Sequence, residues 1–268
     1  MDFPVIDPVI VSLGPIALRW YGLMYLLGFL AAWWLGSVRA KQPGSGWTTE
    51  QVSDFLFYGF LGVVIGGRLG YVFFYQLGLF LDDPLYLFKI WEGGMSFHGG
   101  LLGVLVAFFW YAKAQQRTFF QVADFMAPLV PPGLFFGRIG NFINAELWGR
   151  EAGPDVPWAF RFPTDPQGLL RHPSQLYEAL LEGALLFVML WWFSSRKPPQ
   201  MAVSGLFALG YGGFRFIVEF FREPDAHLGL QALGLSRGQW LCVPLIVLGA
   251  VLIILAYRKA SAQPALAK

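Results

Sequence analysis

The sequence predicts an all-α, polytopic membrane protein. Seven transmembrane helices are expected to form a single integral membrane domain over residues 1–268, with a small extracytoplasmic head. The first observation is composition, because the 268 residues are 56% hydrophobic and only 13% charged, whereas soluble domains are about 25% charged. The second is the abundance of large apolar side chains, with 11 Trp and 27 Phe. A soluble fold of this length cannot bury so much apolar surface, so the expected solvent is a lipid bilayer.

Seven apolar stretches match the requirement of about 20 residues for a membrane span, although the third is short. They cover residues 15–36, 51–75, 97–112, 119–144, 173–193, 201–222 and 238–257. The fourth contains Pro128, Pro131 and Pro132. Because proline removes a backbone donor and clashes with the preceding turn, we expect a kinked or broken helix there.

Lysine and arginine gather in alternate connections between these spans. Nine of them, with the single acid Glu50, lie in residues 37–50, 112–118, 194–200 and the tail from 258. Five Lys or Arg, against eleven Asp or Glu, lie in residues 1–14, 76–96, 145–172 and 223–237. Cytoplasmic connections carry the excess of Lys and Arg, so the first set is predicted to be cytoplasmic and the N-terminus to face outward.

Two of the outer connections are long. Residues 145–172 form the largest polar segment of the chain and are expected to be the extracytoplasmic head. Residues 76–96, which include DDPLYLFKIWEGG, are expected to form a short interfacial helix.

Ten charged residues lie inside the predicted spans, where an ionised group near the bilayer centre costs at least about 2.5–3.5 kcal/mol. They are Arg19, Arg68, Arg138, Arg215, Arg222, Asp54, Asp124, Glu178, Glu182 and Glu219. With the N-terminus outside, all except Asp54 and Asp124 fall toward the outer halves of the spans. The charges therefore predict a polar site that faces the outer leaflet.

The spacing of these residues refines the prediction. Tyr211, Arg215 and Glu219 recur every four residues and so share one helix face. Arg138 and Arg215 offer planar forks of donors that suit phosphate, which predicts a site for an anionic lipid head group. His98 opens the third span from the outside and is a possible general base.

The alternative for these charges is an intramembrane salt-bridge network, and we interpret Glu178, Glu182 and Glu219 as carboxylates that neutralise arginines.

Other classes of site are not indicated. The sequence has no HExxH or CxxC metal motif, no GxSxG elbow and no P-loop. Its single cysteine, Cys242, lies in an apolar run, where burial is expected. No basic run indicates nucleic acid.

Six collinear stretches resemble the prolipoprotein diacylglyceryl transferase family, over about residues 7 to 258. They are RWYGLMYLLGF (19–29), GGRLGYVFFY (66–75), GGMSFHGGLLG (93–103), GRIGNFINAELWGR (137–150), RHPSQLYEALLEG (171–183) and GYGGFRFIVEFFREPD (210–225). The resemblance implies a seven-helix protein of the bacterial cytoplasmic (inner) membrane with its N-terminus outside. It implies transfer of the diacylglyceryl group of phosphatidylglycerol to the lipobox cysteine of a prolipoprotein signal peptide, the first step of lipoprotein maturation. A thioether forms, glycerol phosphate leaves, and no cofactor or metal is needed.

The resemblance also implies site residues, carried over motif by motif. Catalytic roles fall to His98 of the HGG stretch, Arg138 of the GRxGNFxNxExxG signature and Arg215 of the YGxFRxxxE stretch. Substrate binding falls to Tyr21, Arg138, Asn141, Glu146, Gly149, Tyr211, Arg215 and Glu219. The chain departs from the signature at Ala145, where glycine is frequent, and its loop 151–170 is shorter than in some relatives.

Two other functions stay open on the residues alone. A transporter for an anionic substrate would need a polar path to the inner face and often an internal repeat, whereas the inner halves of these spans hold few charges and no repeat is visible. An intramembrane protease would need paired aspartates or a GxSx serine in mid-span, and the sequence has neither.

Overall fold

The computed structural model describes residues 1–4, 6–14, 16–223 and 231–262. The chain forms two compact units, which are described separately below. Unit 1 contains residues 1–32 and 124–268, and unit 2 contains residues 33–123. Pro224 and Asp225 of the last motif, and Lys268 of the predicted cytoplasmic tail, lie outside the described residues. A single integral membrane domain stays a prediction.

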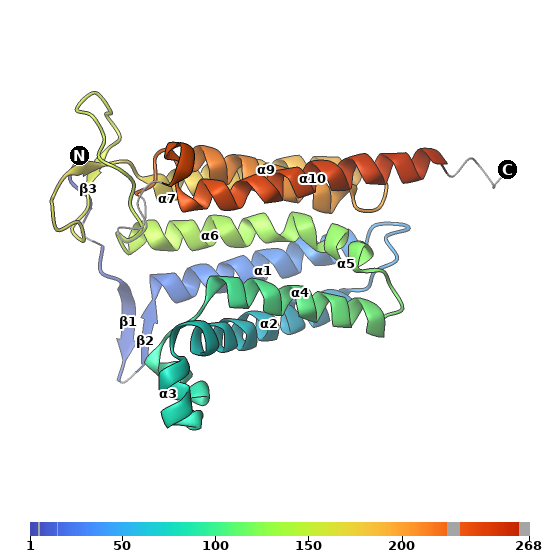
Figure 1. Cartoon of the computed structure of the whole chain (residues 1–268), viewed down its shortest axis with the longest axis horizontal. Helices are drawn as coiled ribbons and strands as arrows, with labels where there is room; N and C mark the ends of the chain where they lie inside the picture. Colours follow the sequence, from blue (N-terminus) through green and yellow to red (C-terminus); the bar gives the residue numbers. More distant parts are fainter. Residues whose placement is uncertain (5, 15, 224–230, 263–268) are drawn as a thin grey trace. The chain divides into compact units, whose positions relative to one another are not determined.

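The described part of the chain is mostly helical, and six of its helical segments are long and apolar enough to cross a membrane. They are Trp20–Ala40 (α1), Thr49–Tyr75 (α2), Phe97–Ala114 (α4), Phe119–Ile143 (α5 to α6), Ser174–Ser195 (α7 to α8) and Arg237–Ala262 (α10). A shorter apolar helix, Ala202–Val218 (α9), lies within the sixth predicted span. The predicted fold class of an all-α, multi-pass membrane protein is therefore confirmed (Figure 1).

The fourth predicted span is broken at its prolines, as expected. Helix α5 (Phe119–Met126) ends before a 3₁₀ turn at Ala127–Leu129 (η3), and α6 (Val130–Ile143) follows. The fifth span is also irregular, because a π-helical segment, Ala179–Leu185 (η4), separates α7 (Ser174–Glu178) from α8 (Leu186–Ser195).

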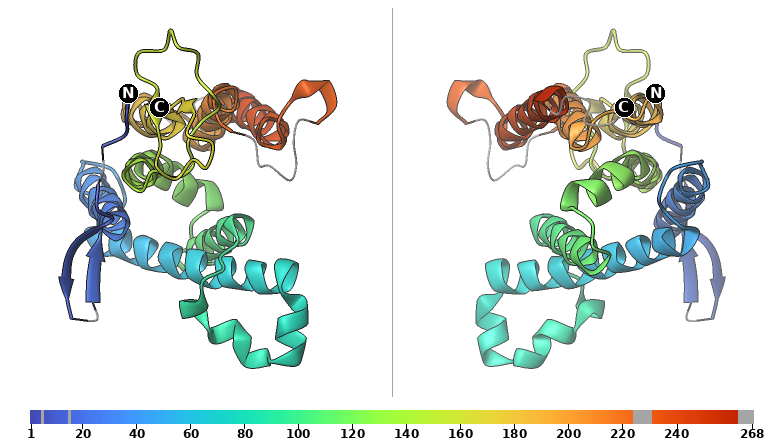
Figure 2. Two further views of the ribbon diagram at one scale, coloured as in Figure 1. Left: turned by 90° about the vertical axis from the view of Figure 1, so that its left-hand side faces the viewer. Right: turned by 90° about the vertical axis from the view of Figure 1, so that its right-hand side faces the viewer.

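The predicted start of the first span was wrong. Strand β2 (Ile16–Arg19) pairs in antiparallel fashion with β1 (Val9–Leu13), and helix α1 begins only at Trp20. The two dark-blue strands lie side by side in Figure 2. Gly14, at φ +60°, supplies the left-handed residue of the turn between them. Arg19 is consequently an exposed strand residue and not a charge inside a span.

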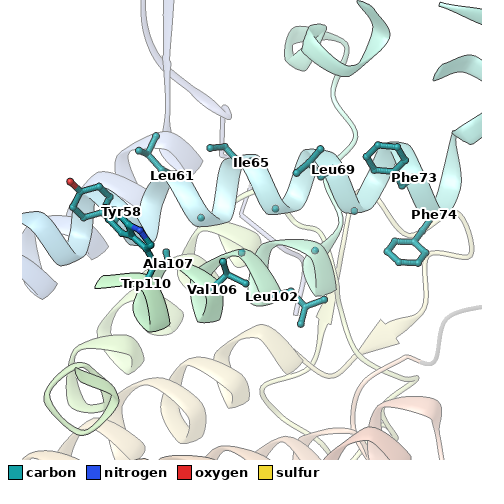
Figure 3. A pocket seen from close by; sticks show the side chains of 15 residues that line it. Tyr58, Leu61, Ile65, Leu69, Phe73, Phe74, Leu102, Val106, Ala107 and Trp110 are labelled. Carbon is teal, nitrogen blue, oxygen red and sulfur yellow. The ribbon is translucent and has the colours of Figure 1, made fainter. Parts of the chain in front are cut away.

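In unit 2, helices α2 and α4 pack backbone to backbone through glycines spaced four apart, which is a common way for membrane helices to approach closely. A Cβ added at Gly70 would lie 2.7 Å from the Cα atom of Gly99. Beside this contact the two helices form an apolar groove of about 560 Å³, lined by side chains that include Leu69, Leu102 and Val106 (Figure 3).

Arg68 of α2 forms hydrogen bonds with the segment that follows this helix. Its guanidinium donates to the carbonyl oxygens of Tyr86 (2.5 Å), Leu87 (3.0 Å) and Gly93 (2.6 Å). The segment itself comprises α3 (Leu77–Asp82) and two 3₁₀ turns, Pro84–Phe88 (η1) and Ile90–Glu92 (η2). Residues 76–96 are therefore helical, as expected, and their interfacial position stays a prediction.

The polar segment 145–172 folds around a short antiparallel pair, β3 (Phe160–Arg161) and β4 (Leu170–Arg171). Phe3 reaches into it and packs with Ala145 and Phe162 in a small buried cluster. The buried Arg171 donates to both carboxylate oxygens of Asp165, at 2.9 and 3.2 Å, and these hydrogen bonds hold the pKa of Asp165 below its usual range. The segment is a folded element, and its extracytoplasmic location stays a prediction.

Replacing Gly62 with alanine is expected to lower the free energy of unfolding of the protein in detergent by about 1–3 kcal/mol, the usual cost of overpacking. The added Cβ would lie 2.6 Å from the carbonyl oxygen of Gly103 and 3.0 Å from the backbone nitrogen of Val104, and backbone atoms cannot move aside cheaply. Gly59→Ala is the control, because on the same helix its Cβ would meet the ring of Phe108 at an ordinary 3.5 Å. Equal unfolding temperatures of the two variants, followed by circular dichroism, would contradict this account of the helix contact.

Candidate functional site

Six charged side chains of unit 1 converge where α6, α7, η4 and α9 meet. We call this group the arginine–glutamate cluster. Its members are Arg138, Arg215, Arg222, Glu178, Glu182 and Glu219. The cluster contains three potential cations and three potential anions, and the ion pairs connect helices that are far apart in the sequence.

Glu178 lies at the centre of the cluster. Its Oε2 atom forms ion pairs with Nε of Arg138 at 2.6 Å and with Nη1 of Arg215 at 2.9 Å, and it accepts a hydrogen bond from the latter. Its Oε1 atom lies 3.7 Å from Nη1 of Arg222. The structure thus brings together the two arginines that the sequence singled out, one from α6 and one from α9, on a single carboxylate oxygen.

A second carboxylate holds Arg215 from its own helix. Glu219 lies one turn further along, and its Oε1 atom accepts from Nη2 of Arg215 at 2.5 Å. The other oxygen of Glu219 accepts from the hydroxyl of Ser236 at 2.7 Å, just before α10. The prediction that Glu178 and Glu219 neutralise arginines is confirmed by these contacts.

The carboxylates and the guanidiniums of the cluster differ in exposure. The side chain of Glu178 is 0% exposed, whereas those of Arg138 and Arg215 are 20% and 15% exposed. Arg138 donates one hydrogen bond to another described residue, from Nη1 to Asn141 at 3.4 Å. Its Nη2 atom donates to no described residue, so Arg138 keeps donors for a ligand.

Asn141 and Glu146 form a chain of hydrogen bonds behind Arg138. Asn141 accepts from Arg138 and donates from Nδ2 to Oε1 of Glu146 at 2.8 Å. The backbone carbonyl of Glu146 accepts from the buried side chain of Gln175 at 2.7 Å. Ala145, just before Glu146, has φ +54°, a left-handed conformation that glycine adopts more easily. This explains physically why glycine is frequent at that position in the signature.

Gly149 joins the end of α9 to the polar segment. Its N–H donates to the carbonyl of His172 at 2.8 Å, and a Cβ there would lie 2.7 Å from that carbonyl oxygen. Neighbouring Arg150 donates to the carbonyls of Arg222 (2.9 Å) and Glu219 (3.4 Å), so it caps the C-terminal end of α9. The close backbone approach gives Gly149 a packing role, and its part in substrate binding stays a prediction.

The two predicted tyrosines also belong to unit 1. The ring of Tyr21, on α1, lies against α6, where a Cβ at Gly140 would be 3.0 Å from its Cδ2 atom. Its hydroxyl is 3.3 Å from that of Tyr25. Tyr211 lies one turn before Arg215 on α9, stacked on Phe207 with ring centroids 5.9 Å apart. Tyr21 therefore contacts the helix that carries Arg138, and Tyr211 lies on the same helix as Arg215.

His98 belongs to unit 2, in the first turn of α4. Ser96 caps this helix by accepting from the N–H of Gly99 at 3.2 Å. The His98 side chain is exposed, and its ring lies edge-on to Phe97. The proposed role of His98 as a base stays a prediction.

Sequence reasoning missed the central place of Glu178 and the pairing of Arg222 with it. In the QLYEALLEG stretch, Glu178 and Glu182 gave a signal only through their four-residue spacing. Nothing in the spacing indicated that Arg222 lies 3.7 Å from Glu178. Within the described residues no group of three or more His, Cys, Asp or Glu side chains is arranged to hold a metal ion.

Comparison with known proteins agrees with the motifs. Residues 8–255 match the family described as prolipoprotein diacylglyceryl transferase. A phosphatidylglycerol–prolipoprotein diacylglyceryl transferase of Vibrio parahaemolyticus is 64% identical over 259 residues, which cover 97% of this chain and 94% of that protein. The protein of the same name from Photobacterium profundum is 62% identical over 264 residues, covering 98% of this chain and 97% of the relative. The chain therefore belongs to the prolipoprotein diacylglyceryl transferase family.

Proposed function

We propose that this protein transfers the diacylglyceryl group of phosphatidylglycerol to a prolipoprotein, the reaction that its relatives are named for. The observation that carries the proposal is the convergence of Arg138 and Arg215 on one buried carboxylate, with both arginine side chains partly exposed. The head group of phosphatidylglycerol is attached through a phosphodiester anion. Guanidinium forks match the oxygens of such an anion in geometry and charge.

The chemistry explains why two arginines are useful. The thiolate of the lipobox cysteine attacks the glycerol carbon that carries the phosphate, a C–S bond forms, and the C–O bond breaks. A phosphodiester with one negative charge thereby becomes glycerol phosphate with up to two. Positive groups held ready where negative charge develops stabilise the transition state more than the ground state. The reaction needs no redox step and no cofactor.

The remaining site residues support these two arginines. Asn141 and Glu146 orient Arg138 through the hydrogen bonds described above, and Glu219 orients Arg215. Tyr21, Tyr211 and Gly149 shape the lipid-binding surface next to them. His98 assists deprotonation of the incoming thiol, because the thiolate is the nucleophile. Cys242 is buried and is not the acceptor, which belongs to the prolipoprotein signal peptide.

The same proposal places the enzyme in the bacterial cytoplasmic (inner) membrane, with its N-terminus outside and its active site facing the outer leaflet. Helices α1, α4 and α10 each carry a basic residue in the last turn: Arg39, Lys113 and Lys259. These ends are the expected cytoplasmic ends. Within unit 1, Glu219 of the arginine–glutamate cluster accepts from Ser236 just before α10, so the cluster lies at the end of α10 opposite to Lys259. Its partners are membrane lipids and prolipoproteins, and not nucleic acid.

A transfer assay tests the function directly. The purified protein is incubated in detergent micelles with phosphatidylglycerol labelled in its acyl chains and a peptide containing a lipobox. We expect label on the peptide and one glycerol phosphate released per lipid consumed, and no transfer to the same peptide with serine in place of cysteine. Absence of transfer by folded protein under conditions where a relative is active would overturn the proposal.

Replacing Arg138 with lysine is expected to lower kcat/KM by about 10²–10³-fold, the usual effect of removing one donor that stabilises developing charge. A lysine ammonium is a point charge and does not reproduce the fork that bridges Glu178 and the phosphate. The control is Arg19→Lys, a change at an exposed strand residue, which should leave the rate unchanged. Turnover of Arg138→Lys close to that of Arg19→Lys would remove Arg138 from phosphate binding.

Replacing His98 with glutamine is expected to lower the rate by about 10²–10⁴-fold and to remove the acidic limb of the pH–rate profile, if the imidazole takes the thiol proton. His172→Gln is the control. The ring of His172 is hydrogen-bonded to Tyr177 at 3.0 Å, and burial lowers the pKa of this histidine. That variant should keep the wild-type profile. A near-normal rate and profile for His98→Gln would instead favour deprotonation of the thiol by the field of the arginines.

A further inference from the structure

We propose that Glu178 is the positioning residue of this site, which holds Arg138 and Arg215 at the spacing that lets both guanidiniums bind one phosphate. The inference rests on the proposed function, and it assigns to Glu178 a role in catalysis that acts through the two arginines. Glu178 is not expected to touch the lipid, because its side chain is 0% exposed.

The first argument is electrostatic. Two guanidiniums repel each other, and in a partly buried site solvent screens that repulsion poorly. Here both lie within 3 Å of one oxygen atom, Oε2 of Glu178, at 2.6 and 2.9 Å. A carboxylate placed between two guanidiniums attracts both of them, and this attraction outweighs their mutual repulsion. Without the carboxylate, the lowest-energy arrangement of Arg138 and Arg215 would be further apart.

The second argument is that the other carboxylates of the cluster do not have this geometry. Glu219 pairs with Arg215 on the same helix and is held on its other side by Ser236. Glu182 lies 3.7 Å from Arg215, and its oxygens have no hydrogen-bond partner in the described part of the chain. Among the acids that the structure describes in this cluster, Glu178 alone forms ion pairs with arginines of both α6 and α9.

The third argument concerns the rigidity of Glu178. It is the last residue of α7, directly before the π-helical segment η4, and such segments often occur at functional sites. The first turn of α7 is tied to the chain that follows α6. Ser174 donates to the carbonyl of Leu147 at 3.1 Å, and Gln175 donates to that of Glu146 at 2.7 Å. The helix that carries Glu178 is thus hydrogen-bonded to Glu146 and Leu147, which belong to the same sequence signature as Arg138.

The fourth argument is that the pairing leaves the arginines able to bind. Glu178 pairs with Nε of Arg138 and with Nη1 of Arg215, and both arginine side chains keep part of their surface exposed. A phosphate that approaches this exposed part would meet both arginines together. Pre-organisation of this kind matters most in the transition state, where the phosphate gains negative charge.

The test compares three variants of the protein: Glu178→Asp, Glu178→Gln and Asp165→Asn. At position 178, aspartate keeps the charge but withdraws the carboxylate by one methylene, and glutamine keeps the length but removes the charge. Asp165→Asn is the matched control, because the Asp165 side chain is also 0% exposed and is ion-paired with an arginine, Arg171, outside the arginine–glutamate cluster. Two quantities are measured in detergent: the steady-state kinetics of diacylglyceryl transfer, and the affinity for inorganic phosphate, which mimics the phosphate of the product, by titration calorimetry.

We expect Glu178→Asp to lower kcat at least about 30-fold and to weaken phosphate binding about 10-fold. Displacing a catalytic group by about 1 Å can lower the rate of an enzyme by about 10²-fold. The KM for phosphatidylglycerol should rise less than about 3-fold, since the lost interaction belongs mainly to the transition state. Glu178→Gln should be at least as impaired. Asp165→Asn should stay within about 3-fold of wild type in both measurements.

Two results would overturn the inference. One is Glu178→Asp with kcat and phosphate affinity close to those of the wild type. The other is Asp165→Asn impaired as strongly as Glu178→Gln, which would show only that buried ion-paired carboxylates stabilise the fold. If Glu178→Gln does not fold, because its arginines have lost a buried counter-ion, the aspartate variant decides. If wild-type protein shows no transfer but phosphate affinity follows the expected order, the proposed function fails and the positioning role stands.

Discussion

The structure of the site depends on one constraint: a charged group inside an apolar helical bundle needs a partner. Removing an ion from water is expensive, and only a close counter-ion with good hydrogen bonds compensates for it. The three arginines of the arginine–glutamate cluster meet this constraint with three glutamates from η4, α7 and the end of α9. The positions of α6, α7 and α9 relative to one another follow from the need to bring these charges together.

The same pairing prepares the site for an anion. If all six groups are ionised, the cluster carries no net charge, which suits a membrane interior. Its members nevertheless differ in exposure, because the side chains of Glu178 and Glu182 are fully buried while those of Arg138 and Arg215 are partly exposed. Under the proposed function, the exposed part of the arginines meets the lipid phosphate. The buried carboxylates then balance the charge within the bundle without occupying that exposed surface.

Much of this could be predicted from the sequence, and the failures have physical causes. The apolar spans and the proline break between α5 and α6 depend on local composition, so they were visible. The start of the first span was misjudged because the apolar residues of β2 look like helix residues when hydrophobicity alone is counted. Arg138 and Arg215 stood out because charge is rare in such segments. Glu178 and Glu182 look alike in sequence, one turn apart, and only the tertiary structure shows that Glu178 bridges two helices while Glu182 does not.

Arg68 and Arg138 illustrate the difference between a structural arginine and one that we propose to bind phosphate. Both follow glycine in a predicted span. Arg68 is 3% exposed and donates to four backbone carbonyls, so its donors are used within the protein. Arg138 is paired with a buried carboxylate, is partly exposed and donates to no described residue through Nη2. Position inside a span therefore does not by itself indicate an arginine that binds a ligand. We propose Arg138 because its buried counter-ion stabilises the charge without using all of its donors, so it still has hydrogen bonds to give to a substrate.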